Sequence, residues 1–298
     1  MSKLLISSLC LLLTFCSGNK EEVSTFKYTH SASVPLIRTE MQNGLANGRI
    51  ILYDSSRNIK GIMHVKDNIL IGNTYSFYDN GCVSRIVKYI NGYETGRRYD
   101  FYNNGQLQAI TNYLNDKKQG LACTFYPSGG LESKVTYANN QAIGDFLDYY
   151  PSPPNRLRKK VQYVIVRGKQ WGNGSINYSP SGSIVNLMDQ LDIAFNKTDY
   201  RMGEDVILTI GVRGPRLKLF KATIADFDSI FNGNDSTAGH TFYGRRHIVQ
   251  IKVKPVHIGT NFIRGYATDY DSTKATSKEG IYRIKQKNIY FQQKYIVK

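Results

Sequence analysis

The first half of the chain repeats itself every 24 residues. Four glycines follow this spacing, namely Gly72, Gly96, Gly120 and Gly144. A second set does the same, namely Gly81, Gly105 and Gly129, and so do aromatic pairs such as Phe77-Tyr78 and Phe101-Tyr102. A fixed period of this length indicates stacked supersecondary units rather than one irregular core. Chains of this kind more often bind along an extended face than catalyse a reaction.

One repeat is predicted to be a β-hairpin. In the unit from Gly72 to Thr95, an Asp-Asn-Gly turn signal at 79–81 is followed by Asn91-Gly92. Asn-Gly and Asp-Gly sequences favour tight hairpin turns, because these residues tolerate positive φ. Two turns per 24 residues leave two strands of about 7–8 residues each. The array is therefore predicted to be an antiparallel meander.

Alternation along the strands predicts one apolar and one wet face. On the first strand of the unit, Tyr75 and Phe77 share a face. On the second, Val83, Val87 and Tyr89 share a face, and the positions between them are mostly polar. Such a pattern is typical of an antiparallel sheet that is solvated on one side.

The array is expected to contain five to six units over residues 44–190. Tyr53 lies 25 residues before Tyr78, so the first unit is expected to slip by one residue. Prolines crowd the turn after Tyr150, and a degenerate sixth unit is expected to begin at Gly172. Atypical terminal repeats cap such stacks.

Three stretches of the array carry a family resemblance. They read Phe-Tyr-Asp-Asn-Gly at 77–81, Phe-Tyr-Asn-Asn-Gly-Gln-Leu at 101–107 and Tyr-Pro-Ser-Gly-Gly-Leu at 126–131. This pattern resembles the bacterial variant of the MORN repeat, as found in YwqK-like antitoxin proteins. The resemblance covers about half of the chain. It implies a protein-interaction module, and it raises an antitoxin or immunity role as an alternative.

The N-terminus resembles a lipoprotein signal. An apolar stretch from Leu4 to Phe15 is too short to span a bilayer and is followed by Cys16 and then small, polar and acidic residues. The segment is similar to the signals of Bacteroidetes lipoproteins, which implies lipidation of Cys16, attachment to a membrane by the lipid alone, and an outer-membrane or cell-surface location. Cleavage after Gly18, with release into the periplasm, is the alternative. Residues 1–18 are thus expected to be the signal and 19–43 a tether.

The 24-residue period stops near Leu191, and residues 191–298 are predicted to form an immunoglobulin-like β-sandwich. Loops rich in Gly, Asn, Asp and Ser are expected at Asn232 to Gly239 and at Asp269 to Ser277. The strands are expected at Leu191 to Phe195, Asp205 to Val212, Leu217 to Ile224, His247 to Lys254, Asn261 to Thr268 and Ile281 to Val297. The predicted fold class is all-β, a meander of hairpin repeats followed by a sandwich.

The chain is basic, with 39 Lys and Arg against 23 Asp and Glu. The excess is spread over both parts, and one cluster stands out after the prolines: Arg156, Arg158, Lys159 and Lys160. A basic surface attracts anions, so an anionic lipid or polysaccharide of the envelope is a candidate ligand of this cluster. A solvated loop without a specific partner is the other interpretation. An exported protein is not expected to bind nucleic acid.

A column of tyrosines is the candidate binding surface. Its members alternate away from Phe77 and its equivalents, and they are Tyr78, Tyr102, Tyr126 and Tyr150. An aromatic ladder can stack sugars or anchor a protein. The alternative is that each ring only packs on its neighbours along the sheet.

Catalytic and metal-binding signatures are not recognised. The five histidines have no metal-ligand spacing, and His240 and His247 are expected to flank a polar turn. Loop carboxylates such as Asp226 and Asp269 lack the spacing of a calcium loop. Cys82 and Cys123 should lie about 14 Å apart, three strand spacings, and stay free thiols. We therefore expect no cofactor and no metal.

Together these features predict a non-enzymatic binding or scaffold protein of the cell envelope, with the repeat sheet as the surface for a protein partner. The alternatives are an immunity-type protein that neutralises a toxin and a glycan-binding or glycan-hydrolysing envelope protein.

Overall fold

The computed structural model describes residues 22–26, 37–152, 154–188, 190–213, 219–224, 240–244, 247–274 and 282–298. In these residues the chain forms strands and turns and no helix. The chain divides into two compact units, residues 1–140 and residues 141–298. The all-β fold class predicted from the sequence is confirmed.

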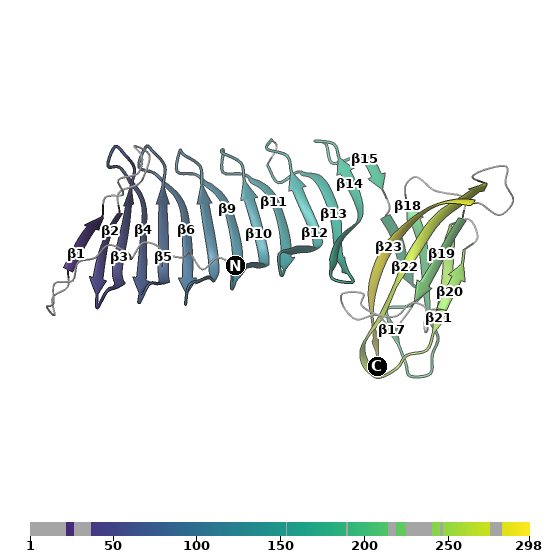
Figure 1. Cartoon of the computed structure of the whole chain (residues 1–298). Coiled ribbons are helices and arrows are strands. Elements are labelled where there is room, and N and C mark those ends of the chain that lie inside the picture. The colour runs from purple at the N-terminus through teal and green to yellow at the C-terminus, as the bar shows by residue number, and fades with distance from the viewer. Residues whose placement is uncertain are drawn as a thin grey trace. The chain divides into compact units, whose positions relative to one another are not determined.

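The first unit is an antiparallel meander in which each strand pairs with the next one along the chain (Figure 1). The short β7 pairs only with β6, and β8 takes its place in the sheet. The strands are β1 (Glu22–Phe26), β2 (Ile37–Gln42), β3 (Leu45–Tyr53), β4 (Ile59–Lys66), β5 (Ile69–Phe77), β6 (Val83–Ile90), β7 (Tyr93–Glu94), β8 (Gly96–Phe101), β9 (Leu107–Leu114), β10 (Lys117–Phe125) and β11 (Leu131–Ala138). Strands β1 and β2 fall within the segment that the sequence suggested as a tether.

Two-residue turns connect neighbouring strands on one side of the sheet, at the strand ends. Asn91 and Gly92 have φ of 50° and 81°, so both central residues are left-handed, as a type I′ hairpin turn requires. The same conformation recurs 24 residues away at Asn115 and Asp116, with φ of 49° and 64°. The turns expected at the Asn-Gly signals are therefore present.

Longer turns connect the strands at their opposite ends. The N–H of Gly81 donates to the carbonyl of Tyr78 at 3.0 Å, and Gly81 is left-handed with φ of 81°. The first repeat makes the same turn. Its residue Arg57, which lies 24 residues before Gly81, has φ of 66°, and its N–H donates to the carbonyl of Asp54. The expected slip of one residue is thus wrong: Asp54 replaces the second aromatic residue, and Tyr53 is the equivalent of Phe77.

Successive hairpins are joined by hydrogen bonds that repeat with the sequence. The N–H of Asp116 donates to the carbonyl of Glu94 at 3.0 Å, and the N–H of Glu94 donates to Oδ1 of Asp116 at 2.7 Å. Asn140 makes the same reciprocal pair with Lys118. The sheet buries a small cluster at Ala46, Ile50 and Val65. Contacts between neighbouring hairpins supply a further part of its stability.

The second unit begins with two more hairpins of the meander, formed by β12 (Gln141–Tyr149), β13 (Leu157–Val166), β14 (Lys169–Tyr178) and β15 (Ile184–Met188). The spacing between equivalent residues grows here to 28, as from Gly144 to Gly172. Part of the extra length lies in the proline-rich turn. There the N–H of Tyr150 donates to the carbonyl of Arg156, six residues on, whereas the N–H of Tyr78 donates to the carbonyl of Cys82, four residues on.

The rest of the second unit is a sandwich of a three-stranded sheet, in the order β16-β18-β21, and a five-stranded sheet, in the order β17-β23-β22-β19-β20. Its strands are β16 (Gln190–Phe195), β17 (Asp199–Tyr200), β18 (Val206–Arg213), β19 (Leu219–Ile224), β20 (His240–Tyr243), β21 (Ile248–Val253), β22 (Gly259–Lys274) and β23 (Tyr282–Val297). Its core packs Leu208 and Ile251 from one sheet against Ala267 and Phe291 from the other. All six strands expected from the sequence are present within a few residues.

One loop expectation is wrong in part. Residues 269–274 continue β22 and pair with residues 282–287 of β23 instead of forming a loop. Tyr270 and Ser272 alternate there with Asp269 and Asp271, and pairing in a long hairpin outweighs the turn preference of the Asp residues. The loop expected at 232–239 lies outside the described residues. The two short strands β17 and β20 had no sequence signal.

Asn173 ties the last repeat hairpin to the sandwich. Its amide donates to the carbonyl of Tyr290 at 2.5 Å and accepts from the N–H of the same residue at 2.5 Å. Trp171 packs edge-on against the Tyr290 ring with 6.1 Å between centroids. Asn173 is only 3% exposed, so this junction within the second unit is closed to solvent.

Candidate functional site

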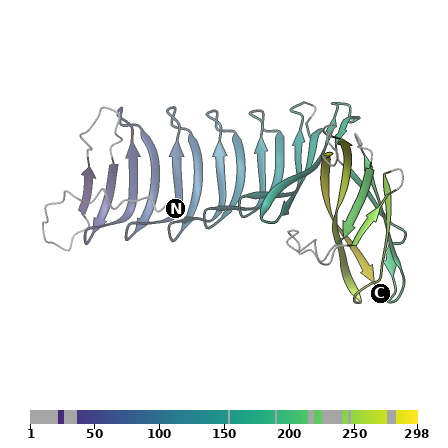
Figure 2. The ribbon, with the colours of Figure 1, turned by 45° about the vertical axis from the view of Figure 1, so that its right-hand side comes forward.

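The strands of the first unit form a single layer in both views of the ribbon (Figures 1 and 2). Residues that lie directly opposite each other on paired strands share a face. Thr74 pairs with Val87 and defines face A, whereas Tyr75 pairs with Ile86 and defines face B. No described strand of this unit packs on either face.

A β-bulge in every hairpin alters the expected faces. Phe77 pairs with Val83 and Ser76 with Arg85, so Ser84 is an extra residue on its strand. An extra residue reverses the alternation beyond it. Val83 therefore lies on face B with Phe77, while Val87 lies on face A. The expectation of one apolar and one wet face is wrong, because both faces carry apolar rows.

Face B carries three apolar rows that run across the strands. The middle row follows the register from β3 to β10 and consists of Ile51, Ile62, Tyr75, Ile86, Tyr99, Ile110 and Cys123. A second row flanks the longer turns and consists of the pairs Tyr53–Ile59, Phe77–Val83, Phe101–Leu107 and Phe125–Leu131. The third, next to the two-residue turns, consists of Leu45, Ile69, Ile90, Tyr93 and Leu114.

Much of this apolar surface meets solvent. Residues of the third row are exposed by between 39% (Leu45) and 53% (Leu114). The middle row is half-buried from Ile62 onward, since neighbouring side chains cover each other along the row. Large exposed apolar patches are unusual on monomers and are typical of interaction surfaces.

Face B is also basic. Its exposed cations are Arg38, Arg49, Lys66, Lys88, Arg97 and Lys117, and Lys134 is half-buried. Its one carboxylate between residues 37 and 138 is Glu40. The remaining carboxylates of that range lie in turns (Asp54, Asp67, Asp79 and Asp116), at a bulge (Glu132) or on face A (Glu94 and Asp100).

Face A has the opposite character, because its charges are paired. Asp100 is 9% exposed and accepts from Arg85 at 2.5 Å and from Arg98 at 3.1 Å. Arg98 also stacks on the ring of Tyr113, 4.5 Å from its centroid. Burial raises the pKa of Glu94, although Arg98 lies 3.6 Å away. These contacts bind neighbouring strands to each other and leave little charge for a ligand.

The tyrosine column connects successive repeats. The hydroxyl of Tyr78 donates to the carbonyl of Phe101 at 2.6 Å, and that of Tyr102 donates to the carbonyl of Phe125 at 2.8 Å. The hydroxyl of Tyr150 donates to the carbonyl of Tyr178 at 2.7 Å. All four tyrosines of the column, Tyr126 included, are half-buried. These bonds to the next hairpin give the phenols a structural role.

The basic cluster after the prolines does not converge on one point. Arg158 forms a bidentate pair with the buried carboxylate of Asp148, with bonds of 2.9 and 3.0 Å. Lys160 pairs with Asp145 at 2.8 Å, and Arg156 donates to the carbonyl of Ser181 at 3.3 Å. Lys159 is exposed and pairs across the sheet with Asp148, so it lies on the other face from Lys160.

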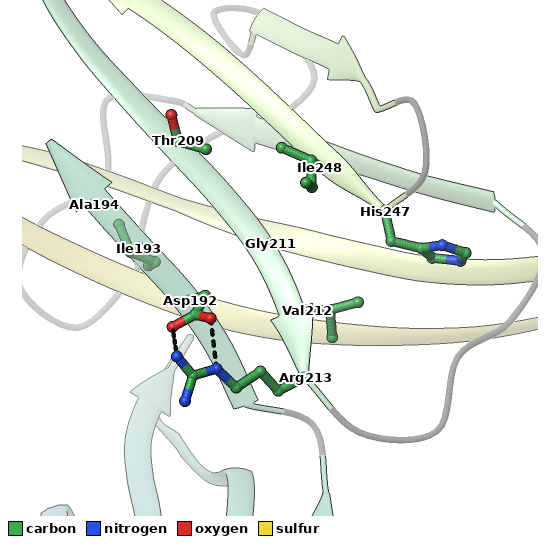
Figure 3. Close-up of a pocket in the computed structure, with 9 residues that line it drawn as sticks. All are labelled: Asp192, Ile193, Ala194, Thr209, Gly211, Val212, Arg213, His247 and Ile248. Carbon is green, nitrogen blue, oxygen red and sulfur yellow. Dashed lines mark hydrogen bonds and ion pairs between the residues drawn. The ribbon is translucent and has the colours of Figure 1, made fainter. Parts of the chain in front are cut away.

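The sandwich contains a shallow hollow of ≈ 340 Å³ on its three-stranded sheet (Figure 3). Gly211 forms its floor and Ile248 one side, and Asp192 and Arg213 face each other across two hydrogen bonds. This internal pairing satisfies both charged groups. His247 lies at the rim, left-handed with φ of 64°, beside the turn expected there.

Metal-binding clusters and cysteine thiols are the remaining candidate sites. Among the residues that the structure describes, no three His, Cys, Asp or Glu side chains could together hold a metal ion. Asp226, Asp228 and Asp235 lie outside the described residues. Cys82 and Cys123 are free, and burial raises the pKa of Cys123.

The described part of the chain contains no helix long and apolar enough to cross a membrane. The signal segment and Cys16 lie outside the described residues, so the lipid anchor stays a prediction.

Comparison with known proteins agrees with the repeat assignment. Residues 94–115 and 118–139 each match the family model of the MORN repeat variant. These two matches include β8, β9, β11 and nearly all of β10, with the longer turns after Phe101 and Phe125. No curated protein matches the chain. The matched repeats suggest a binding or scaffold role carried by the repeat array.

The sequence did not single out face B as a site. Its aromatic and aliphatic residues were recognised, but the bulge at Ser84 and its equivalents hid which of them share a face. The signal that could have found them is the recurrent polar residue directly after Val83 and Leu107, where a bulge can be accommodated.

Proposed function

We propose that this protein is a non-enzymatic binding or scaffold protein of the cell envelope that holds another protein on face B of its repeat sheet. The observation that carries the proposal is the middle row, which runs across consecutive strands and has no described element packed over it. The chain thus maintains a regular, partly apolar face, over which none of the described strands of the first unit packs.

The size of face B fits a stable interface. Nine strands, β2 to β6 and β8 to β11, are separated by eight spacings of about 4.8 Å, and strands of about eight residues are about 26 Å long. The face therefore measures about 1,000 Å², which exceeds the roughly 800 Å² per partner of a standard protein–protein interface. The mixture of Tyr, Phe and Ile with Arg is also typical of interface cores.

The envelope location rests on the N-terminal signal. Metabolic labelling with a palmitate analogue tests it, because the intact chain should incorporate label and the Cys16→Ser variant should not. Equal labelling of both would refute the lipid anchor and favour release into the periplasm.

The binding role is tested with a pair of matched double variants. Tyr75→Thr/Tyr99→Thr removes two rings from face B, and Tyr89→Thr/Tyr137→Thr removes two half-buried rings from face A. Threonine keeps a high strand propensity in both. Detergent-solubilised envelope is passed over each protein, and bound proteins are identified by mass spectrometry.

We expect one stoichiometric partner that binds the native chain and the face A variant and is lost from the face B variant. Identification of that partner as a toxin would place the protein in the immunity class. Equal retention by all three proteins, with all three folded by circular dichroism, would refute face B as the binding surface.

A further inference from the structure

The geometry points to an acidic protein segment that also carries apolar side chains as the occupant of face B. This inference rests on the proposed function and names the chemistry of its partner. Two independent features of the face lead to it: the imbalance of its charges and the position of its cations between apolar rows.

The charge imbalance is specific to face B. The ion pairs of the first unit join Lys60 to Asp54 and Asp79, Arg85 to Asp100, and Arg98 to Glu94 and Asp100. These groups lie on face A, in turns or at a bulge. None of the six exposed cations of face B forms an ion pair with a described residue. Their charge is therefore available to an anionic partner.

The cations follow the apolar rows. Arg49 lies two residues before Ile51, Lys88 two residues after Ile86, and Arg97 two residues before Tyr99. Side chains two residues apart on a strand share a face. Each cation is thus beside the middle row, on the side of the two-residue turns, and between it and the third row. A ligand that contacts the cations also meets apolar surface on both sides.

This arrangement distinguishes between occupants. A second copy of the chain would oppose six exposed cations with six more across the same face, and like charges in an interface cost several kcal/mol. A simple polyanion would satisfy the cations and leave the apolar rows exposed to water. A protein segment with carboxylates flanked by apolar side chains satisfies both, and burial of the rows supplies the larger share of the affinity.

The test uses synthetic peptides on the full chain. One set carries Glu and Leu in alternation, a second replaces each Glu with Lys, a third replaces each Glu with Gln, and a fourth replaces each Leu with Ser. Binding is measured by fluorescence anisotropy at about 0.1 M and about 1 M salt, where the Debye length is about 10 Å and about 3 Å.

We expect the Glu–Leu peptide to bind at least tenfold more tightly than the other three and to weaken severalfold at high salt. The Lys88→Glu/Arg97→Glu variant should abolish this preference. The matched control Lys169→Glu/Lys294→Glu changes two exposed lysines of the second unit and should bind as the native chain does.

Each other result refutes a defined part of the account. Equal binding of the Glu–Leu and Gln–Leu peptides, lost in Tyr75→Thr/Tyr99→Thr, would keep face B as a protein surface and refute its preference for acidic partners. Equal binding of the Glu–Leu and Glu–Ser peptides would show a polyanion site. Binding to vesicles of phosphatidylserine and phosphatidylcholine, with no peptide bound, would assign the face to membranes. If none of the probes shows binding that depends on face B, the inference and the proposed function are both refuted.

Discussion

Among the four consecutive two-residue turns at 67–68, 91–92, 115–116 and 139–140, one lacks a stabilising bond. In three of these turns, the side-chain oxygen of the second residue accepts the N–H of the residue 22 positions earlier: Asn68 from Ala46 at 2.8 Å, Asp116 from Glu94 at 2.7 Å and Asn140 from Lys118 at 2.7 Å. In the turn at 91–92 the equivalent residue is Gly92, which offers no such oxygen to Leu70. The change Gly92→Asn should add this bond.

The backbone already has the geometry that the substitution needs. Gly92 has φ of 81°, close to the 64° of Asn68 and the 70° of Asn140. The nearest atom to an added Cβ is Cγ2 of Ile69, at the ordinary contact distance of 3.5 Å. Asparagine tolerates this conformation better than other side chains.

The expected gain follows from three terms. A net hydrogen bond contributes about 0.5–1.5 kcal/mol, and the loss of glycine's freedom in the unfolded chain contributes about 0.4–1 kcal/mol. The left-handed conformation offsets part of this. We expect Gly92→Asn to stabilise the unit by about 0.5–1 kcal/mol and Gly92→Ala, which has the strain without the bond, to destabilise it by about 1 kcal/mol.

The assay is hydrogen exchange at the amide of Leu70, supported by urea unfolding. Repeat arrays can unfold in parts, so a local probe is more direct than a single melting temperature. Protection of the Leu70 amide should rise about two- to fivefold in Gly92→Asn. If Gly92→Asn and Gly92→Ala give the same protection and the same urea midpoint, the side-chain oxygen contributes nothing and the reasoning is refuted.

Three further predictions concern single groups. Burial raises the pKa of Glu94 above its usual 4.5, so the ionised form is disfavoured in the fold and stability falls as pH rises through the raised pKa; Glu94→Gln should remove this fall in a pH series of urea midpoints, and an unchanged slope would contradict it. Asn173→Ala leaves two buried backbone groups of Tyr290 without their partner and should cost about 2–4 kcal/mol; a cost below about 0.5 kcal/mol in urea unfolding would show that the junction is not closed. Cys82 and Cys123 should both be alkylated without a reductant, Cys123 more slowly because burial raises its pKa; fewer than two adducts by intact mass would contradict free thiols.

Turn chemistry made much of the fold readable from the sequence. Asn91-Gly92 and Gly81 need left-handed backbone, which few residues adopt, so their recurrence set the positions of both turns. The sandwich strands were readable for a related reason, since β-branched and aromatic runs such as that of β18 are bounded by Gly and charged residues. In the first repeat, by contrast, Arg57 adopts the left-handed conformation that glycine has in the other repeats, and an arginine does not indicate such a turn.

The faces of the sheet were harder to predict than its strands. A single bulged residue reverses the side of the sheet on which every later side chain lies. Ser84 alone resembles an ordinary polar strand position, and only the recurrence of a polar residue at this point of each repeat indicates the bulge. The candidate site was affected directly. The Tyr78 column was visible as a pattern, whereas its hydrogen bond to Phe101 depends on the stacking distance between hairpins. The basic surface of face B emerged only when the register divided the charges between the two faces.

In vivo photo-crosslinking from the two faces tests the central claim most directly. A photoreactive aromatic residue is placed in the intact chain instead of Tyr99 on face B or, as the matched control, instead of Tyr137 on face A. If face B holds a partner protein, irradiation of cells should give one discrete adduct from position 99 and none from position 137. An adduct from position 137 alone, or the same adducts from both positions, would contradict the account.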